Sequence, residues 1–305
     1  MIEIEDNRNY EYLYSCEFAG TPLKKSEENY ITIPLSVILD DEIDLRRVAV
    51  FSYLRCCCGL DGICRFTVPS IVSWCGGKPD KRTDGVNDKT LNVIDALNDR
   101  GYLTYLTKPS KSSYMECEFD FDKYNDEHQS GFATIYLDEI KKILNYKKQS
   151  EKDSRLTNTT ILLVFAYLRA KIYRRPNKLK PEQRNREGIE KRKQELPEAY
   201  NSLLIDISNE IGISEKTLIK ALDILEEDLG LIVTERAYRI RNGKGEFRTL
   251  HTIFANAYKR VGNNLLATGE EYSRNEIKMK VNKLKEYGWD FTINKEKRKT
   301  RKGVN

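Results

Sequence analysis

The chain contains the stretch Val50-Phe51-Ser52-Tyr53-Leu54-Arg55, which returns later as Val164-Phe165-Ala166-Tyr167-Leu168-Arg169. A second pair of motifs repeats in the same order, because Lys89-Thr90-Leu91 returns as Lys216-Thr217-Leu218. In both copies, the Lys-Thr-Leu motif runs into a leucine-bearing helical pattern, then a glycine, and then a segment with strand character. The pattern predicts one small unit of helix, helix-turn-helix and hairpin that occurs twice, and such an internal repeat governs how the whole fold is interpreted.

The size and composition of the chain bound the class of protein. Its 305 residues suffice for two domains of ordinary size. Hydrophobic residues make up 39% and charged residues 32%, which is polar for a globular protein but does not indicate disorder throughout. The chain has no apolar run long enough to span a membrane, and its acidic start lacks the apolar core of a signal peptide. We expect a cytoplasmic protein without membrane contact.

Charge is distributed unevenly along the chain. Residues 1–130 carry 15 Lys and Arg against 23 Asp and Glu, a net charge of −8. Residues 131–305 carry 37 against 24, a net charge of +13. A basic half beside an acidic half indicates one surface for a polyanion and another for a different partner, although a lysine-rich surface also serves solubility alone.

The first copy of the repeat spans residues 30–130 and follows an acidic N-terminal arm, residues 1–29. Its expected elements are, in chain order, a strand at residues 31–34, a helix around residues 50–58, a short helix at residues 68–74, a third helix that Asn87 caps and Gly101 ends, and a hairpin of residues 102–107 and 113–119. We assign the hairpin as a wing.

The second copy spans residues 131–260 and contains a charged insertion at about residues 174–199. Its first helix is expected to be amphipathic, because apolar residues recur with helical spacing from Ile161 to Ile172. The following helix-turn-helix places Gly212 at the turn and Ser214 as the cap of the next helix. A hairpin is then predicted around Asn242-Gly243-Lys244-Gly245. Residues 261–305 form a helical extension and a basic C-terminal tail at residues 295–302.

These elements predict an α+β fold, mainly helical, with two tandem winged-helix domains and β-hairpin wings. In the second copy, the helix after the turn offers short polar groups and cations near its N-terminus, and the wing carries arginines, as a DNA-reading surface requires. The predicted DNA-binding residues are Ser214, Lys216, Thr217, Lys220, Arg236, Arg239, Arg241, Lys244 and Arg248. Solvated charges on a protein-docking module are the alternative interpretation.

The first copy presents a more acidic surface. Carboxylates on its third helix and wing, such as Asp95 and Glu118, would be repelled by phosphates at close range. We therefore expect this copy to mediate dimerisation or partner docking. Secondary DNA contacts are assigned to Lys78, Lys81, Arg82, Lys89 and Asn92.

The sequence favours no catalytic or metal chemistry. The chain has 7 cysteines, including the adjacent Cys56-Cys57-Cys58, but lacks paired Cys-x-x-Cys knuckles, so reduced buried thiols are expected and zinc is the minor alternative. It has no phosphate-binding loop of the ATPase kind, and its two histidines stand apart in the sequence. We expect a protein that is not an enzyme and needs no cofactor.

Through its repeated motifs and the order of its predicted elements, the chain resembles the tandem winged-helix replication initiators of plasmids and phages, of the low-GC Gram-positive type. The similarity covers residues 30–258 and lies in the order of elements. The resemblance implies an N-terminal winged helix that mediates dimerisation and a C-terminal one that binds origin repeats. It also implies double-stranded DNA and host replication proteins as partners, with a homodimer or a monomer–dimer equilibrium. A transcriptional regulator with the same DNA contacts, and a replisome adaptor or helicase loader that binds protein, are the alternatives.

Overall fold

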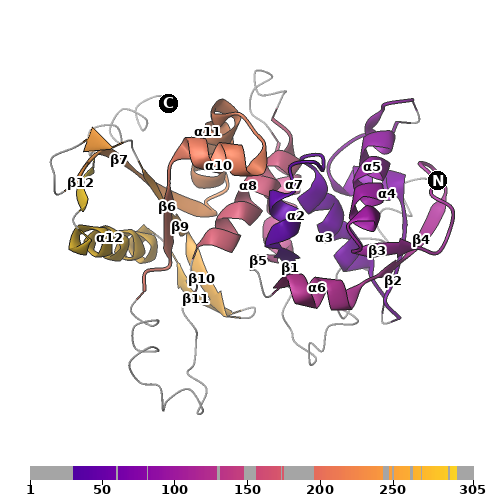
Figure 1. The fold of residues 1–305 in the computed structure, drawn as a ribbon, viewed down its shortest axis with the longest axis horizontal. Coiled ribbons are helices and arrows are strands. Elements are labelled where there is room, and N and C mark those ends of the chain that lie inside the picture. Colours follow the sequence, from indigo (N-terminus) through magenta and orange to yellow (C-terminus); the bar gives the residue numbers. More distant parts are fainter. Residues whose placement is uncertain are drawn as a thin grey trace, which may run out of the picture. The chain divides into compact units, whose positions relative to one another are not determined.

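The computed structural model describes residues 30–59, 61–80, 82–128, 131–147, 156–172, 174, 196–242, 247–248, 251–261, 264–268, 270–287 and 289–293. The chain divides into two compact units, unit 1 (Met1–Ala170) and unit 2 (Lys171–Asn305). Both combine helices with small antiparallel sheets, which confirms the α+β class (Figure 1). In the described part of the chain, no helix is both long and apolar enough to cross a bilayer.

Unit 1 follows the predicted order and adds elements that the sequence did not reveal. The acidic arm lies outside the described residues. The elements are β1 (Tyr30–Pro34), α2 (Leu35–Leu39), α3 (Arg47–Cys57), β2 (Ile63–Thr67), α4 (Val68–Trp74), α5 (Val86–Asp99), β3 (Leu103–Tyr105), β4 (Tyr114–Phe119), α6 (Phe121–His128), β5 (Phe132–Tyr136), α7 (Leu137–Leu144) and α8 (Asn158–Lys171), the last of which ends at the boundary with unit 2. The sequence patterns missed α2, β2, α6 and α7, which are short or flanked by charge.

Unit 2 contains the predicted helix-turn-helix and hairpin, and most of the charged insertion lies outside the described residues. Its elements are β6 (Ala199–Ser202), α10 (Leu204–Ile211), α11 (Glu215–Asp223), the π-helical turn η3 (Ile224–Asp228), β7 (Ile232–Asn242), β8 (Phe247–Arg248), β9 (Thr252–Asn256), β10 (Tyr258–Val261), β11 (Asn264–Thr268), α12 (Glu270–Glu286) and β12 (Trp289–Ile293). The helical extension predicted after residue 261 is α12. The strands β6, β10, β11 and β12 were not expected.

The repeat seen in the sequence is also a repeat of elements. The first copy runs β1, α2, α3, β2, α4, α5, β3, β4, and the second runs β5, α7, α8, β6, α10, α11, β7, β9. The sheets agree as well, because the first has the strand order β2-β4-β3 and the second contains the order β6-β9-β7. The second copy therefore begins in unit 1, with β5, α7 and nearly all of α8, and continues in unit 2.

The opening strands of the two copies pair with each other inside unit 1. β1 and β5 run antiparallel, and Thr32 lies opposite Thr134. Each threonine is followed by an isoleucine, one further residue and a leucine that starts a helix, Leu35 in α2 and Leu137 in α7. Because each threonine faces its own counterpart, the strand pair has local two-fold character, as in a self-complementary interface between identical subunits.

The helix α8 is buried on all sides rather than amphipathic. Every residue from Thr159 to Arg169 is buried, so the predicted one-sided apolar stripe was wrong. Apolar residues recur with helical spacing from Ile161 to Ile172, but Leu162, Leu163 and Ala166 fill the remaining faces of the helix. A helix that is apolar all round occupies the centre of a core. Its counterpart α3 is likewise buried along its whole length.

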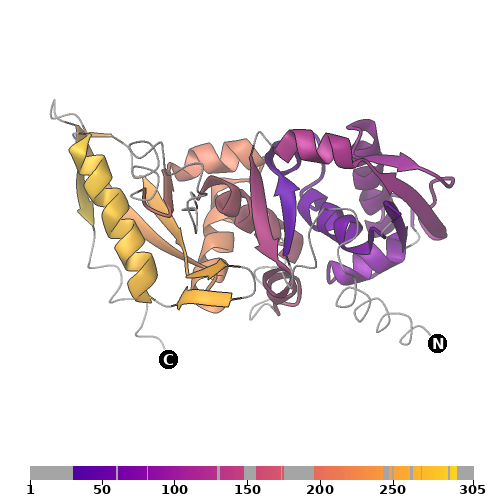
Figure 2. The same cartoon turned by 90° about the horizontal axis from the view of Figure 1, so that it is seen from below.

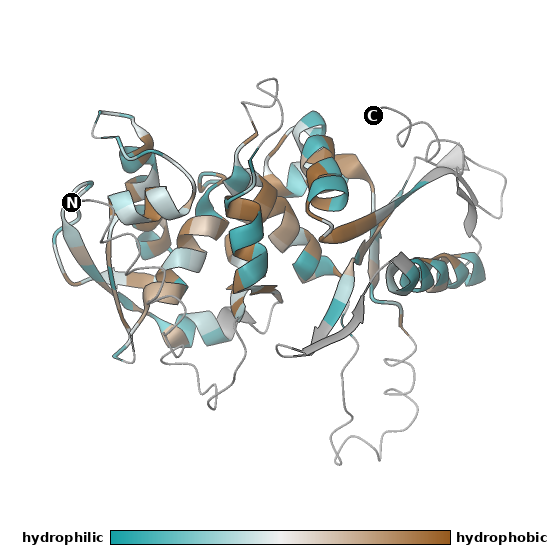
Figure 3. Cartoon of the chain, turned by 180° about the vertical axis from the view of Figure 1, so that it is seen from behind, coloured by the Kyte–Doolittle hydropathy of each residue, from teal (hydrophilic) through white to brown (hydrophobic). Residues whose placement is uncertain are grey.

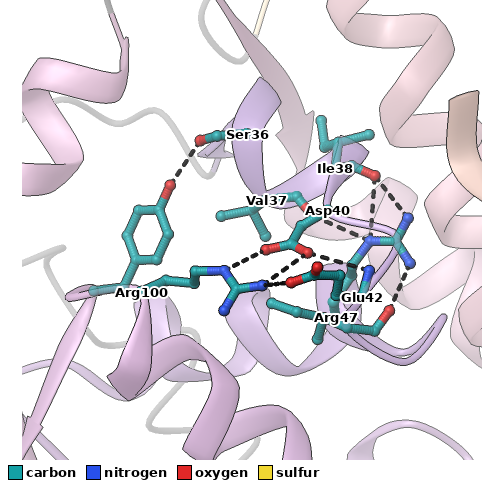
Figure 4. A network of polar contacts seen from close by, with 9 residues as sticks. Ser36, Val37, Ile38, Asp40, Glu42, Arg47 and Arg100 are labelled. Atoms are coloured by element: carbon teal, nitrogen blue, oxygen red, sulfur yellow. Dashed lines mark hydrogen bonds and ion pairs between the residues drawn. The ribbon is translucent and has the colours of Figure 1, made fainter.

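Two arginines fix the loop between α2 and α3 (Figure 4). The guanidinium of Arg47 is fully buried and donates to the carbonyl oxygens of Val37, Ile38 and Ile43 at 2.9–3.2 Å. Burial lowers the pKa of Arg47. Arg100, just after α5, donates to Asp40 at 2.9 Å. This contact joins the C-terminal end of α5 to the loop.

The start of α5 differs from the prediction that Asn87 caps it. Gly85 is the N-cap residue, and Asn87 lies inside the first turn with its side chain buried. Its amide oxygen accepts from the backbone N–H of Asp80 at 3.1 Å, and its amide nitrogen donates to the carbonyl of Lys111 at 3.0 Å. Asn87 therefore joins the loop before α5 to the loop between β3 and β4, a role that local sequence does not encode.

The sheet of unit 2 is covered on one face by α12. Ile277 and Val281 of this helix pack against Ala199, Ile253 and Ala255 from β6 and β9. Figure 2 shows α12 in yellow beside these strands, and Figure 3 shows that much of the helix is hydrophilic. The helix therefore contributes one apolar stripe to a core that has no counterpart in the first copy.

Candidate nucleic-acid interface

The helix-turn-helix of unit 2 is built from short-range sequence signals. The residue at the turn, Gly212, has φ +74°, a left-handed conformation that glycine adopts without steric cost. The next helix begins at Ser214, whose hydroxyl accepts the backbone N–H of Thr217 at 3.2 Å. The predicted turn and cap are both confirmed. They fix the direction in which α11 leaves the turn.

One face of α11 is buried and the other carries polar groups. Leu218, Ala221 and Leu222 are almost fully inaccessible to solvent, as the i, i+3, i+4 spacing predicts. Lys216 is exposed, while Thr217 and Lys220 are half-buried. The polar residues assigned to DNA binding thus lie together along the first two turns of one helix, on the side away from its apolar core.

The hydroxyls at the start of α11 are already engaged with each other. The oxygens of Ser214 and Thr217 are 2.8 Å apart, in addition to the capping bond. A hydroxyl still offers a donor or acceptor beyond two such contacts. The pair can therefore hold the helix terminus and also meet a phosphate or a base edge.

The predicted wing is a hairpin whose described pairs share one register. β9 pairs with β7 from Ile232 opposite Asn256 to Arg236 opposite Thr252, and β8 continues the same register with Arg241 opposite Phe247. Arg239 and Arg241 lie in β7 and Arg248 lies in β8. Lys244, at the predicted turn, lies outside the described residues. The backbone thus places three of the assigned arginines on the two strands of the wing.

Arg236 occupies a different position from the other wing arginines. Its guanidinium donates to the carboxylate of Asp223 at 3.2 Å, and both side chains are partly exposed. Since Asp223 is the last residue of α11, this ion pair links β7 to the end of α11. Exposed pairs of this kind contribute at most about 1 kcal/mol to stability. The pair orients the wing rather than leaving Arg236 as an isolated phosphate contact.

The residues assigned as secondary contacts lie around the start of α5 in unit 1. Lys78, Lys89 and Asn92 are exposed, and Lys81 lies outside the described residues. Arg82 is exposed but forms an ion pair with Asp80 at 2.7 Å. Nearby, Lys111 forms an ion pair with Asp88 at 3.0 Å. Cations and carboxylates therefore alternate on this surface, which weakens its field for a polyanion compared with an all-cationic surface.

The cysteines of the first copy gather in its core. Cys64 lies opposite Cys117 in the β2–β4 register and opposite Cys58 in an isolated bridge. The thiols of Cys57 and Cys64 both donate to the carbonyl of Leu54. Burial raises the pKa of Cys117 to about 12, so its thiol stays protonated at neutral pH. Within the described ranges, no three His, Cys, Asp or Glu side chains are placed to hold a metal ion.

Comparisons with known proteins give no independent assignment. No family model matches the chain, and no curated protein matches it closely enough to count as a relative. The functional argument therefore rests on the sequence and on the geometry of each unit.

Proposed function

We propose that this chain is a sequence-specific double-stranded DNA-binding protein built from two tandem winged-helix domains. The second copy supplies the recognition helix α11 and the wing β7–β8. The observation that carries the proposal is the capped helix-turn-helix that leads through η3 into a hairpin, with Lys216 and Lys220 on the side of α11 away from its apolar face. The order of helices and strands in both copies supports the fold assignment.

The start of α11 suits a major groove. A helix N-terminus presents free backbone N–H groups and the positive end of the helix dipole, both of which attract phosphate. Short hydroxyl side chains and lysines reach base edges or phosphates from the same position. Glu215 in the first turn opposes this attraction, so the lysines must supply the favourable charge.

Within this class we propose a plasmid or phage replication initiator that binds origin repeats and recruits host replication proteins. The resemblance in element order and the charge split between the two halves support this role. The more acidic first copy then serves dimerisation or partner docking, in a homodimer or a monomer–dimer equilibrium. This assignment implies a non-enzymatic cytoplasmic protein that requires no cofactor.

The proposed site is tested by the double substitution Lys216→Ala with Lys220→Ala. Each lost phosphate contact should lower the slope of log affinity against log salt concentration by about 1, and a lost base contact should cost roughly 1–3 kcal/mol. Titration of labelled DNA at several salt concentrations measures both effects. The matched control is Lys278→Ala with Lys285→Ala, which removes two exposed lysines from α12 in the same unit. Equal binding by both double variants would contradict the site assignment.

Footprinting on the DNA that flanks the gene separates the possible roles. Several direct repeats beside an AT-rich tract support an initiator. A single palindrome at a promoter supports a transcriptional regulator with the same contacts. The absence of any footprint supports a replisome adaptor or helicase loader that binds protein.

A further inference from the structure

The third helices of the two copies end differently. In the first copy, the buried residues of α5 finish at Leu97, and Gly101 follows four positions later in the left-handed conformation. In the second copy, Leu225 has the corresponding place, because the buried residues before both leucines have the same spacing, at positions 93 and 94 and at positions 221 and 222. Gly230, which is also left-handed, follows Leu225 five positions later. The second copy therefore has one extra residue at this helix end.

The extra residue lies in the π-helical turn η3, which continues α11. The backbone bond that closes the helix end is one residue longer in the second copy. There the N–H of Leu231 donates to the carbonyl of Leu225 at 2.8 Å, whereas in the first copy the N–H of Tyr102 donates to the carbonyl of Leu97 at 3.0 Å. Single π turns within helices are rare and occur frequently at functional sites. This one lies where the chain passes from α11 toward β7.

Both copies join the third helix to the first strand of the hairpin through an aspartate at the same helix position. Asp95 and Asp223 each follow directly after the second buried residue of the spacing given above. The carboxylate of Asp95 accepts from the hydroxyl of Tyr105 in β3 at 2.6 Å. The carboxylate of Asp223 accepts from the guanidinium of Arg236 in β7 at 3.2 Å. A link between helix and hairpin is therefore common to both copies.

The second copy adds another carboxylate contact through η3. The half-buried Glu226 accepts the backbone N–H of the buried Thr234 at 2.8 Å and its hydroxyl at 2.5 Å. Hydrogen bonds to an ionised acceptor are about twice as strong as bonds between neutral groups. The first copy has the neutral Asn98 directly after Leu97, where the second has Glu226 after Leu225. In the second copy, β7 is thus held to the helix end at two positions along the strand.

The angle between helix and strand decides where the arginines of β7 lie. A strand rises about 3.3 Å per residue, so the backbone of Arg241 lies about 23 Å along β7 from Thr234. A tilt of about 10° at Thr234 would move Arg241 by about 4 Å, which exceeds the length of a hydrogen bond. Binding groups need placement within about 0.5 Å and 10–20° to act together. A contact at Thr234 therefore controls the distant end of the strand.

We propose that Glu226 and Asp223 are positioning residues of the DNA-binding surface. Their bonds to Thr234 and Arg236 fix the angle between α11 and β7, so that the helix and the arginines of the strand meet one duplex together. The inference rests on the proposed function and assigns sequence specificity to this angle. Two carboxylates beside a phosphate-binding surface lower its attraction for any polyanion. Their contribution is therefore to the choice of sequence and not to general affinity.

The first test is Glu226→Ala in the full-length protein. The probes are a short duplex from the footprinted segment and a random duplex of the same length and base composition. We expect specific affinity to fall by about fivefold or more, as for one lost base or phosphate contact. Affinity for the random duplex should stay unchanged or rise, because a negative charge is removed. A parental ratio of specific to random affinity overturns the proposal, and so does an equal loss for both duplexes, which indicates a role in stability alone.

Two further variants serve as rescue and control. Glu226→Gln should restore the parental ratio, because its amide can accept the N–H of Thr234 and donate to the hydroxyl. Glu271→Ala removes the same charge from an exposed position on α12 and should leave the ratio unchanged. A ratio that falls equally in the Ala and Gln variants contradicts the positioning role, because charge and not hydrogen bonding then decides the effect.

Thr234→Val keeps the test decisive if Glu226→Ala does not fold. It removes only the hydroxyl bond and should lower the ratio by about twofold or more, measured where circular dichroism shows a folded protein. A parental ratio in folded Thr234→Val overturns the proposal. If Lys216→Ala with Lys220→Ala loses binding while the Glu226 and Thr234 variants keep the ratio, the positioning proposal fails alone. If the parent gives no footprint, the proposed function fails and the positioning role fails with it.

Discussion

Two arginines at equivalent positions indicate the structural role of the repeated motif. Arg55 and Arg169 end the two copies of the motif, and both are buried. The guanidinium of Arg55 lies 4.9 Å from the ring centres of Phe119 and Tyr124, and that of Arg169 lies 4.8 Å from the ring of Phe165 and pairs with Glu139. Stacking on aromatic rings makes a buried cation tolerable. The motif is therefore a packing motif, and its arginines are not surface contacts.

The hydroxyl of Ser214 has a structural role that a substitution can separate from its proposed role in DNA binding. Ser214→Ala removes the capping bond and should lower the free energy of unfolding of unit 2 by about 1 kcal/mol. Ser214→Asp keeps a capping oxygen but adds a negative charge where phosphate is expected. We expect the Asp variant to match the parent in denaturant unfolding and to bind DNA much more weakly. Parental DNA affinity of the Asp variant would place the interface elsewhere.

Among the helices and strands, the helix-turn-helix of the second copy depends on short-range sequence signals. In the first copy, the start of the corresponding helix α5 depends on long-range contacts. Gly212 and Ser214 act within a few residues of themselves, so their pattern predicts structure directly. Asn87 instead connects Asp80 to Lys111 across loops that are distant in sequence. A side chain amide with this role resembles an ordinary helix cap in the sequence. That similarity explains the wrong assignment of the cap.

Substitution of Asn87 should test this long-range role. Asn87→Ala leaves the N–H of Asp80 and the carbonyl of Lys111 without their partner, and we expect a loss of about 1–3 kcal/mol in the free energy of unfolding. Asn92→Ala is the matched control, because Asn92 is exposed on the same helix and its removal should change stability by no more than about 0.5 kcal/mol. Urea denaturation followed by circular dichroism compares the two variants. A similar midpoint for both would contradict the role assigned to Asn87.

At the scale of the whole molecule, the two sheets differ in one face. In unit 2, Ile253 and Ala255 of β9 face α12. The equivalent positions in β4 of unit 1 carry Glu116 and Glu118, and Glu116 pairs with Arg65 of β2 at 3.4 Å. A polar face tolerates water, whereas an apolar face requires cover. Both copies thus have the same arrangement of core elements, and the C-terminal extension belongs to the second copy alone.

Truncation should reveal this dependence. A chain that ends at Thr268 lacks α12 and β12 and exposes Ala199, Ile253 and Ala255, so we expect unit 2 to lose cooperative unfolding and DNA binding. A chain that ends at Ile293 keeps both elements and should unfold like the parent. Ile277→Ala should destabilise unit 2 by about 2–5 kcal/mol without removing any charge. Cooperative, parental unfolding of the shorter chain would show that the sheet of unit 2 does not need the helix.

Local sequence patterns were sufficient to predict the duplication, the helix-turn-helix with its glycine turn and serine cap, the hairpin and the helix after it. These features depend on spacing and turn chemistry within a few residues. The folded structure was needed to reveal the burial of α8 on all sides, the pairing of β1 with β5, the ion pair of Arg236 and the strand β12 beside β7. Each of these depends on contacts between separate helices and strands. The contacts that stabilise these features form between surfaces that exist only after folding. Local sequence patterns do not specify which other segment supplies the partner surface.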